Sequence, residues 1–410
     1  MQVNATRRWL RFALFMMLAV TVGCAHVSRH PLPTALADVA MVPEMPPGIR
    51  AWGDEYSPAF QESVVDSVSQ VTAAYGDHVP TDVLAISGGG ASGAFAAGLL
   101  RGWSETGTRP TFRLVTGVSV GAIIAPFAFL GPEYDDQLRE LATSVSDEKV
   151  YRSKQLLGSL WSDSVTDTAP LVRFLRHYYN QDVLNAVAAE HAKGRRLYVG
   201  TTNLDSGRPV IWDLGAIAAS GSPHALKLFQ QVIFASASIP VVFQPAYIPV
   251  EAQGKRYDEM HVDGGVTAQL ILYGEAISLS DMKRHIPDAD LPESPKPTVY
   301  IIRNAKLAPE HHTVRPQVLN IAGLAVTTLI KSQAVGDLYR LHAICQRDGL
   351  QFRLASIPND LTLPHTARVF DAKEIGTLYT CGYELGRARY AWATEPPGLT
   401  AQPPTRAALR

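Results

Sequence analysis

A serine between two glycines lies between two apolar runs, in the segment Gly117–Gly121 (Gly-Val-Ser-Val-Gly). The run before it, Phe112–Thr116, predicts a short buried strand, and the run after it, Ala122–Ala125, predicts the start of a helix. A sharp turn from strand to helix strains the backbone of such a serine and lifts its hydroxyl clear of the sheet. This context indicates a nucleophile at Ser119 more strongly than the five-residue pattern does.

A glycine-rich segment, Ser87–Gly93 (Ser-Gly-Gly-Gly-Ala-Ser-Gly), has the same kind of context. The apolar run Asp82–Ser87 predicts a strand before it, and Ala94–Leu100 predicts a helix of small residues after it. A strand, a glycine turn and a helix N-terminus together direct several backbone N–H groups toward one point. Such a segment binds an anion, which is either a phosphate or the oxyanion of an acyl-transfer transition state.

A third motif places an aspartate at the start of a glycine pair, Asp263-Gly264-Gly265. Taken alone it is also an ordinary turn signal, because Asp-Gly is a common turn pair. A carboxylate is ionised at neutral pH, with an unperturbed pKa of about 3.9, and can accept the proton of a serine hydroxyl.

In order and type, these three motifs resemble those of the patatin-like phospholipases, a group of serine acyl hydrolases. The segments Val199–Gly207 and Ala235–Pro240 are also similar to that family. The resemblance covers residues 81–305 well and 306–395 weakly, and it does not extend to the first 80 residues. It implies a three-layer α/β/α sandwich with a mostly parallel central sheet.

The resemblance also implies roles for individual residues. Ser119 would be the nucleophile and Asp263 the proton acceptor of a Ser-Asp dyad, with no metal or organic cofactor. The oxyanion hole would be formed by the backbone N–H groups of Gly88, Gly89, Gly90 and Ala91. The remaining motif glycines would support this geometry: Gly93, Gly117, Gly121, Gly264 and Gly265. Many family members carry Arg or Lys where this chain has Ser92, so a preference for anionic head groups is not implied.

Two other interpretations of the motifs agree less well with the sequence. A dinucleotide-binding loop would need an acidic residue at the end of the next strand. That strand leads into Thr116–Ser119 without an acid, and Glu105 lies in a predicted loop, so this interpretation is disfavoured. A Ser-His-Asp triad would need a histidine after the acid, and none of the five later histidines lies in a loop of small residues. His261 would share a strand face with Asp263, and we expect it to be structural.

Composition favours one large α/β enzyme over a nucleic-acid-binding or metal-binding protein. The chain has 410 residues, 46% of them hydrophobic, and a formal net charge of −1. No basic patch suggests nucleic acid, and the three cysteines, Cys24, Cys345 and Cys381, are isolated. If the chain enters an oxidising envelope compartment, Cys345 and Cys381 are free to pair.

The N-terminal sequence predicts that the protein is localised in a bacterial cell envelope. Three arginines precede an eleven-residue apolar stretch, Phe12–Val22, which is too short to span a membrane and ends at Gly23-Cys24. This pattern resembles a lipoprotein signal over residues 1–24, with Cys24 lipidated; an ordinary cleaved signal peptide is the alternative. Ala25 favours the outer membrane in the lipoproteins that this resembles. Residues 25–57 are rich in proline and predict an extended tether.

The remaining segments complete one predicted domain over residues 58–395, with its motif core at 81–305. Apolar spacing predicts helices over 58–75, 135–144, 170–179 and near 318–345. Residues 150–161 mix cations with apolar side chains, which fits either a cap over an acyl pocket or core packing. Residues 285–297 predict a surface loop, and 396–410 a tail of low order.

The sequence therefore predicts a serine-dependent acyl-ester hydrolase acting on phospholipid or lysophospholipid at a membrane. Two alternatives stay open. One is an acyltransferase in which an alcohol resolves the same acyl-enzyme. The other is a catalytically silent envelope lipoprotein that uses the fold to bind lipid or a partner.

Overall fold

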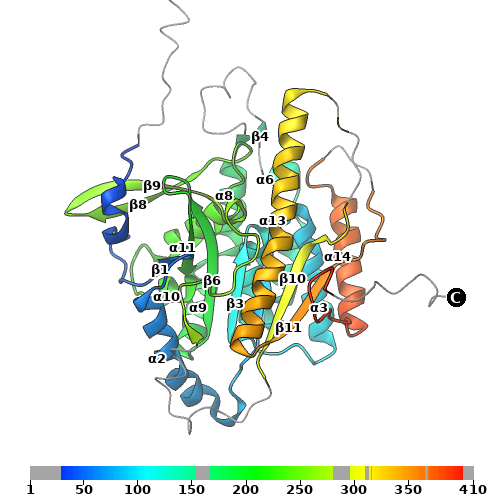
Figure 1. Ribbon diagram of the computed structural model, residues 1–410, viewed down its shortest axis with the longest axis horizontal. Coiled ribbons are helices and arrows are strands. Elements are labelled where there is room, and N and C mark those ends of the chain that lie inside the picture. The colour runs from blue at the N-terminus through cyan, green and yellow to red at the C-terminus, as the bar shows by residue number, and fades with distance from the viewer. Residues whose placement is uncertain are drawn as a thin grey trace, which may run out of the picture.

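The computed structural model describes residues 29–150, 152–153, 166–279, 296–309, 314, 316–364 and 368–399. A mixed nine-stranded sheet forms the centre of the molecule, and helices cover both of its faces (Figure 1). The strands of this sheet are β1 (Arg50–Trp52), β2 (Val83–Ile86), β3 (Leu114–Val118), β6 (Arg196–Asn203), β7 (Arg208–Asp213), β8 (Ala246–Ala252), β9 (Lys255–Asp263), β10 (Thr298–Lys306) and β11 (Gln351–Ile357). A separate pair joins β4 (Arg152–Ser153) to β5 (Thr166–Asp167).

Two hydrophobic clusters, one on each face of the sheet, make up the core. The larger cluster is built under α3 (Gly93–Glu105), α4 (Val120–Leu130), α5 (Asp135–Thr143), α8 (Ala169–Tyr178), α9 (Gln181–Ala192), α10 (Leu214–Ala219), α11 (Ala225–Ser236) and α14 (Ala372–Arg387). The smaller cluster lies under α2 (Pro58–Tyr75) and α13 (Val318–Asp348). Short elements connect these: η1 (Thr34–Val39), η2 (Gly76–His78), η3 (Gly90–Ser92), η4 (Pro132–Tyr134), η5 (Gly264–Val266) and α6 (Asp147–Val150).

The predicted α/β fold with a mostly parallel central sheet is confirmed. Five neighbouring strands, β6-β3-β2-β10-β11, are parallel, as expected for short apolar runs that are buried on both faces. The helices predicted over 58–75, 135–144, 170–179 and 318–345 correspond to α2, α5, α8 and α13. No helix in the described part of the chain combines the length and apolar character needed to cross a membrane.

The antiparallel strands bring two distant segments together on one edge of β6. β3 runs parallel to β6 and pairs with it as far as Val118, opposite Gly200. β9 runs in the opposite direction and pairs with β6 from Thr201, which lies opposite Asp263. Because β7 occupies the other edge of β6, β3 and β9 share this edge and meet end to end. The carboxyl ends of both strands therefore lie next to each other.

The tether predicted over residues 25–57 differs from the structure where the structure describes it. From residue 29 onward this segment packs against the domain: Pro31 and Met41 form bridges to the β8–β9 hairpin, and β1 pairs with β7. Arg29 forms ion pairs with Asp205 and Asp258. The segment is not extended throughout, because Thr34–Val39 form the short helix η1, and the chain on either side of this helix pairs with strands of the domain.

Helices α3 and α14 are in close contact, and glycines make this possible. A Cβ atom added at Gly98 or Gly102 would overlap backbone atoms of α14, and one added at Gly382 would overlap the backbone of α3. The two helices thus pack with their backbones nearly touching, over the face of the sheet that carries the larger cluster.

Several predictions fall outside the described residues. These are the signal segment 1–24 with Cys24, most of the cap candidate 150–161, most of the loop 285–297, and residues 400–410 of the tail. Cys345 and Cys381 are both described and both are free thiols, so they do not form the disulfide that an oxidising compartment would permit.

Candidate active site

Ser119 occupies the turn between β3 and α4, as the sequence predicted. Its backbone has φ 57° and ψ −126°, a strained conformation for a residue with a side chain. The side-chain hydroxyl of Ser236 holds this turn, accepting the Ser119 N–H at 2.9 Å and donating to the Gly200 carbonyl at 2.6 Å. Gly121 is required because a Cβ there would overlap the Ile86 carbonyl of β2. The result is a serine fixed at the N-terminus of a helix, where the helix dipole favours negative charge.

Asp263 ends β9 beside Ser119, on the shared edge of β6. Its Oδ1 accepts the Gly265 N–H at 2.7 Å, while Oδ2 is buried without a well-aligned hydrogen bond to any described residue. Burial raises the pKa of Asp263 to about 6; the Ser119 hydroxyl and the Gly265 N–H act in the opposite direction by stabilising the ionised carboxylate. The carboxylate is thus a stronger base than an exposed aspartate, and it interacts with the serine hydroxyl.

The glycine-rich loop passes directly next to Ser119. A Cβ placed on Gly88 would lie 3.1 Å from the Ser119 Cβ. The N–H of Gly88 donates to the backbone carbonyl of Gln269 at 3.4 Å. Unlike the other three predicted donors, it therefore already has an acceptor within the protein. The N–H groups of Gly89, Gly90 and Ala91 donate to no acceptor in the described part of the chain. Asn304 supports the loop from β10, because its side-chain amide donates to the Ser87 carbonyl at 2.9 Å.

Gln269 joins the two halves of this site, and the sequence motifs did not single it out. Its side-chain Nε2 donates to the Gly265 carbonyl at 3.2 Å, and its backbone carbonyl accepts the Gly88 N–H. Asp337 on α13 fixes Gln269 by accepting its backbone N–H at 2.6 Å. The available signal was a glutamine inside the apolar run Ala268–Leu272. The other missed residue is Ser236, which lies in a segment noted only for its family likeness.

An apolar pocket opens next to Ser119. It begins at Gly90 and Ala91 and is walled by side chains of α4, α5, α6, α8 and the loop after α11. The largest side chains in the lining are Phe174, Phe243 and Phe370, the last of which lies just before α14. Among the described residues that line the pocket, Ser119 alone has a polar side chain. A hydrocarbon chain fits such a lining, with its ester end at the serine.

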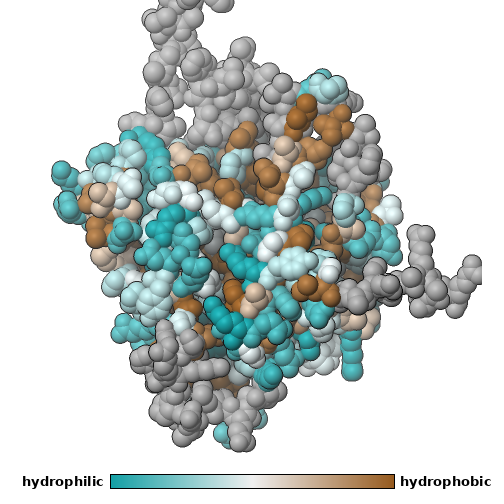
Figure 2. Space-filling view, viewed as in Figure 1, coloured by the Kyte–Doolittle hydropathy of each residue, from teal (hydrophilic) through white to brown (hydrophobic). Residues whose placement is uncertain are grey.

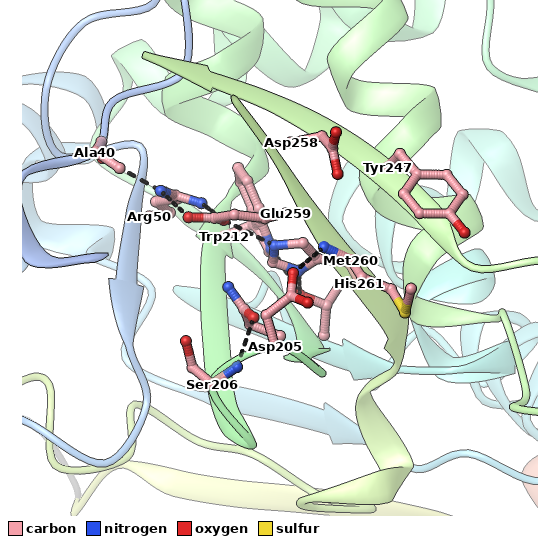
Figure 3. A network of polar contacts seen from close by, with 12 residues as sticks. Ala40, Arg50, Asp205, Ser206, Trp212, Tyr247, Asp258, Glu259, Met260 and His261 are labelled. Atoms are coloured by element: carbon pink, nitrogen blue, oxygen red, sulfur yellow. Dashed lines mark hydrogen bonds and ion pairs between the residues drawn. The ribbon is translucent and has the colours of Figure 1, made fainter. Parts of the chain in front are cut away.

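His261 shares a strand face with Asp263 but belongs to a separate polar network (Figure 3). Its ring nitrogens contact the Thr201 hydroxyl at 3.0 Å and a carboxylate oxygen of Glu259 at 3.1 Å. Glu259 in turn forms a bidentate ion pair with Arg50, from the N-terminal segment. Burial lowers the pKa of His261. Both ring nitrogens are therefore engaged, which agrees with the structural role expected of this histidine.

A metal site is not formed within the described ranges, where no cluster of three or more His, Cys, Asp or Glu side chains has a suitable arrangement. The positioned groups that remain are a strained serine, a buried carboxylate, free backbone N–H groups and an apolar pocket. On an α/β sheet, these groups define a lipid acyl hydrolase.

The model of the patatin-like phospholipase family matches residues 84–272, and the chain is similar to that family of hydrolases over this part of its length. Comparison with curated proteins gives no match. The solved structures that match include VipD and ExoU. VipD from Legionella pneumophila shares 13% identity, with a TM-score of 0.31 and coverage of 76% of this chain and 67% of VipD. The type III effector ExoU shares 16% identity, with a TM-score of 0.24 and coverage of 75% of this chain and 52% of ExoU. The chain thus spans about half of ExoU, and likenesses this weak carry no argument about activity.

Proposed function

We propose that the protein hydrolyses acyl esters of phospholipids or lysophospholipids through Ser119 and Asp263. The observation that carries this proposal is the end-to-end meeting of β3 and β9, which sets the strained serine beside a buried carboxylate and next to an apolar pocket. A lipid ester suits both parts, because its acyl chain needs an apolar lining and its carbonyl needs a nucleophile.

In the first half of the reaction, the Ser119 oxygen attacks the ester carbonyl carbon while its proton passes to Asp263. The carbonyl oxygen becomes an oxyanion, which accepts hydrogen bonds from the N–H groups of Gly89, Gly90 and Ala91. One such donor contributes about 3 kcal/mol to the stability of the transition state. The intermediate then collapses, the alcohol leaves with the proton from Asp263, and the acyl group remains on Ser119.

In the second half, water takes the place of the alcohol. Asp263 accepts a proton from this water as its oxygen attacks the acyl carbon, and the same N–H groups stabilise the second oxyanion. Collapse releases the fatty acid and returns the proton to the Ser119 oxygen. Since the pKa of Asp263 is about 6, it is ionised at neutral pH and basic enough to accept a proton transiently.

Labelling with a fluorophosphonate probe tests the nucleophile. The wild type should be labelled and Ser119→Ala should not, because the probe reacts only with an activated serine. Ser92→Ala is the matched control, since it removes a hydroxyl from the neighbouring glycine loop, and it should be labelled like the wild type. Asp263→Asn should be labelled far more slowly. Labelling of a folded Ser119→Ala variant would refute the assignment.

Two alternatives are separated by product analysis. An acyltransferase would convert added alcohols into new esters at the expense of free fatty acid, and Ser119→Ala would abolish both products. A silent lipid-binding protein would retain lipid without forming either product, and it would not react with the probe.

A further inference from the structure

The N-terminal half of α13 is unusual for the surface of a protein. Residues 318–330 contain no charged residue, and at 1.5 Å per residue they extend about 20 Å. Leu329 is 70% exposed and Ile321 53%, and none of the described side chains in this half is buried. The C-terminal half differs, because Ala334, Leu338 and Leu341 are buried against the sheet. We call residues 318–330 the apolar half of α13.

This apolar half lies at the end of the molecule that carries the active site. α13 connects β10 to the parallel strand β11, so it starts at the carboxyl edge of the parallel strands, where Ser119 also lies. Its upper part stands above the sheet in Figure 1, and apolar side chains gather over it in Figure 2. Asp337, just beyond this half, holds Gln269 next to Asp263. The apolar half thus extends outward from the level of the catalytic groups.

Further exposed apolar side chains belong to loops and to the short helix η5 at the site. Val241, which is 70% exposed, and Val242 lie between the pocket-lining residues Ile239 and Phe243. Val241 has a φ of 72°, which is strained for a β-branched residue. The others are Val266, three residues after Asp263, and Val369, next to the pocket-lining Phe370. We call these four valines the apolar rim.

The position of the rim limits what can cover it. A lipid substrate must enter through the pocket mouth, so a protein seated over the rim and the apolar half would close the site. A lipid surface would instead supply the substrate. Charge favours an anionic surface: the chain from Lys306 to Lys331 carries three cations, Lys306, Arg315 and Lys331, against one anion, Glu310.

We propose that the apolar half of α13 and the apolar rim dock the enzyme on an anionic phospholipid surface, with the pocket mouth facing the lipid. This proposal deepens the proposed function and rests on it for the identity of the substrate. Exposed apolar side chains that gather on one surface mark interaction sites, and partial burial of Leu329 and Ile321 among acyl chains supplies the attraction.

Kinetics of the full chain on two substrates test the proposal. Leu329→Glu should lower hydrolysis of phospholipid in vesicles of phosphatidylcholine with some phosphatidylglycerol by about tenfold or more. It should leave hydrolysis of a soluble short-chain ester unchanged, because that substrate needs no surface. Ala74→Glu is the matched control: it adds the same charge at an exposed position of α2, at the opposite end of the sheet. Equal effects of the two substitutions on vesicle hydrolysis would overturn the proposal.

Binding is measured separately from catalysis, in the Ser119→Ala background. An environment-sensitive fluorophore on Leu329→Cys should shift to the blue when these vesicles are added, and one on Ala74→Cys should not; the labelled parent corrects for the native cysteines. No shift at position 329 would overturn the proposal, even if another part of the chain binds the vesicles. A shift that follows protein concentration without vesicles would also overturn it, in favour of a second copy. A vesicle-dependent shift without hydrolysis by the wild type would support docking and refute the proposed function.

Discussion

Asp263 combines deep burial with a carboxylate oxygen, Oδ2, that has no well-aligned hydrogen bond within the described part of the chain. Burial disfavours the ionised form, and one N–H from Gly265 together with the Ser119 hydroxyl compensates only in part, so the pKa of Asp263 is raised to about 6. The base of the proposed dyad is therefore close in strength to a histidine. This removes the main chemical objection to a carboxylate as the partner of a serine.

The pH dependence of turnover follows from this pKa. We expect kcat/KM on a soluble ester to fall about tenfold per unit below pH 6 and to be flat above pH 7, because only the ionised form of Asp263 accepts the proton. Stopped assays in buffers of constant ionic strength would measure this. His261→Gln is the control, and it should keep the same inflection, since burial lowers the pKa of His261. An inflection near pH 4, or one that disappears in His261→Gln, would contradict the prediction.

At this scale the sequence predicted the two residues of the proposed dyad but not the contacts that support them. Ser119 and Asp263 stand in local patterns whose backbone geometry is set by adjacent glycines, so a single sequence is enough to propose them. Ser236 and Gln269 act through contacts across the chain, with the backbone of Ser119 and with Gly265 and Gly88. Their residue types are common in many other contexts, and only the fold brings them to the site.

At the scale of elements, the packing of α3 against α14 depends on the absence of side chains. Gly98 and Gly102 of α3 are one helical turn apart, as are Gly382 and Gly386 of α14, and each contacts the backbone of the other helix. α3 begins in the glycine-rich loop, so this packing also sets the direction from which the loop's N–H groups approach Ser119.

Two substitutions on α14 should have opposite effects on stability. Gly382→Ala should lower the free energy of unfolding by about 1–3 kcal/mol, because its methyl group would overlap the α3 backbone. The midpoint of thermal unfolding should fall accordingly. Gly376→Ala lies on the same helix with no atom within 4 Å of the added Cβ, and it should raise stability by about 0.5–1 kcal/mol. Calorimetry of both variants measures the difference. A destabilised Gly376→Ala or an unaffected Gly382→Ala would show that the two helices are not packed in this way.

The elements themselves were largely predictable, because apolar periodicity over 58–75 or 135–144 is a local property. The direction in which β9 runs in the sheet could not be predicted from the sequence. Nothing in the segment Lys255–Asp263 shows that it enters the sheet antiparallel, on the edge of β6 left open where β3 ends. This pairing depends on which edge of β6 is left open by β7 and β3, so it is a property of the whole sheet.

At the scale of the whole molecule, the N-terminal segment 29–57 is fastened to the strand that carries Asp263. Arg50 reaches Glu259, which is buried and contacts His261. Burial alone would raise the pKa of Glu259, but hydrogen bonds from His261 and Arg50 and the charge of Arg50 lower it to about 2. The ionised form of this buried acid thus depends on a partner supplied by the segment that proline content had suggested to be a tether.

Loss of that partner should destabilise the protein more than loss of a comparable surface pair. Arg50→Met should cost about 3 kcal/mol, because it leaves Glu259 buried without its cation. Arg208→Met removes the cation of an exposed cluster with Asp54 and Glu55, and it should cost less than about 1 kcal/mol. Thermal unfolding compares the two, and limited proteolysis should cut the 29–57 segment faster in Arg50→Met alone. Equal losses would mean that Arg50 does not anchor this segment.

The meeting of β3 and β9 on one edge of β6 also has a consequence for timing during synthesis. Ser119 leaves the ribosome early, together with β3 and the glycine-rich loop, and its base follows only when β9 has been made and has found its edge of β6. A nascent or truncated chain that stops before β9 therefore presents a serine with no proton acceptor. If the proposed dyad carries out hydrolysis, the producing cell is exposed to it only by chains in which β9 has been made and has paired with β6.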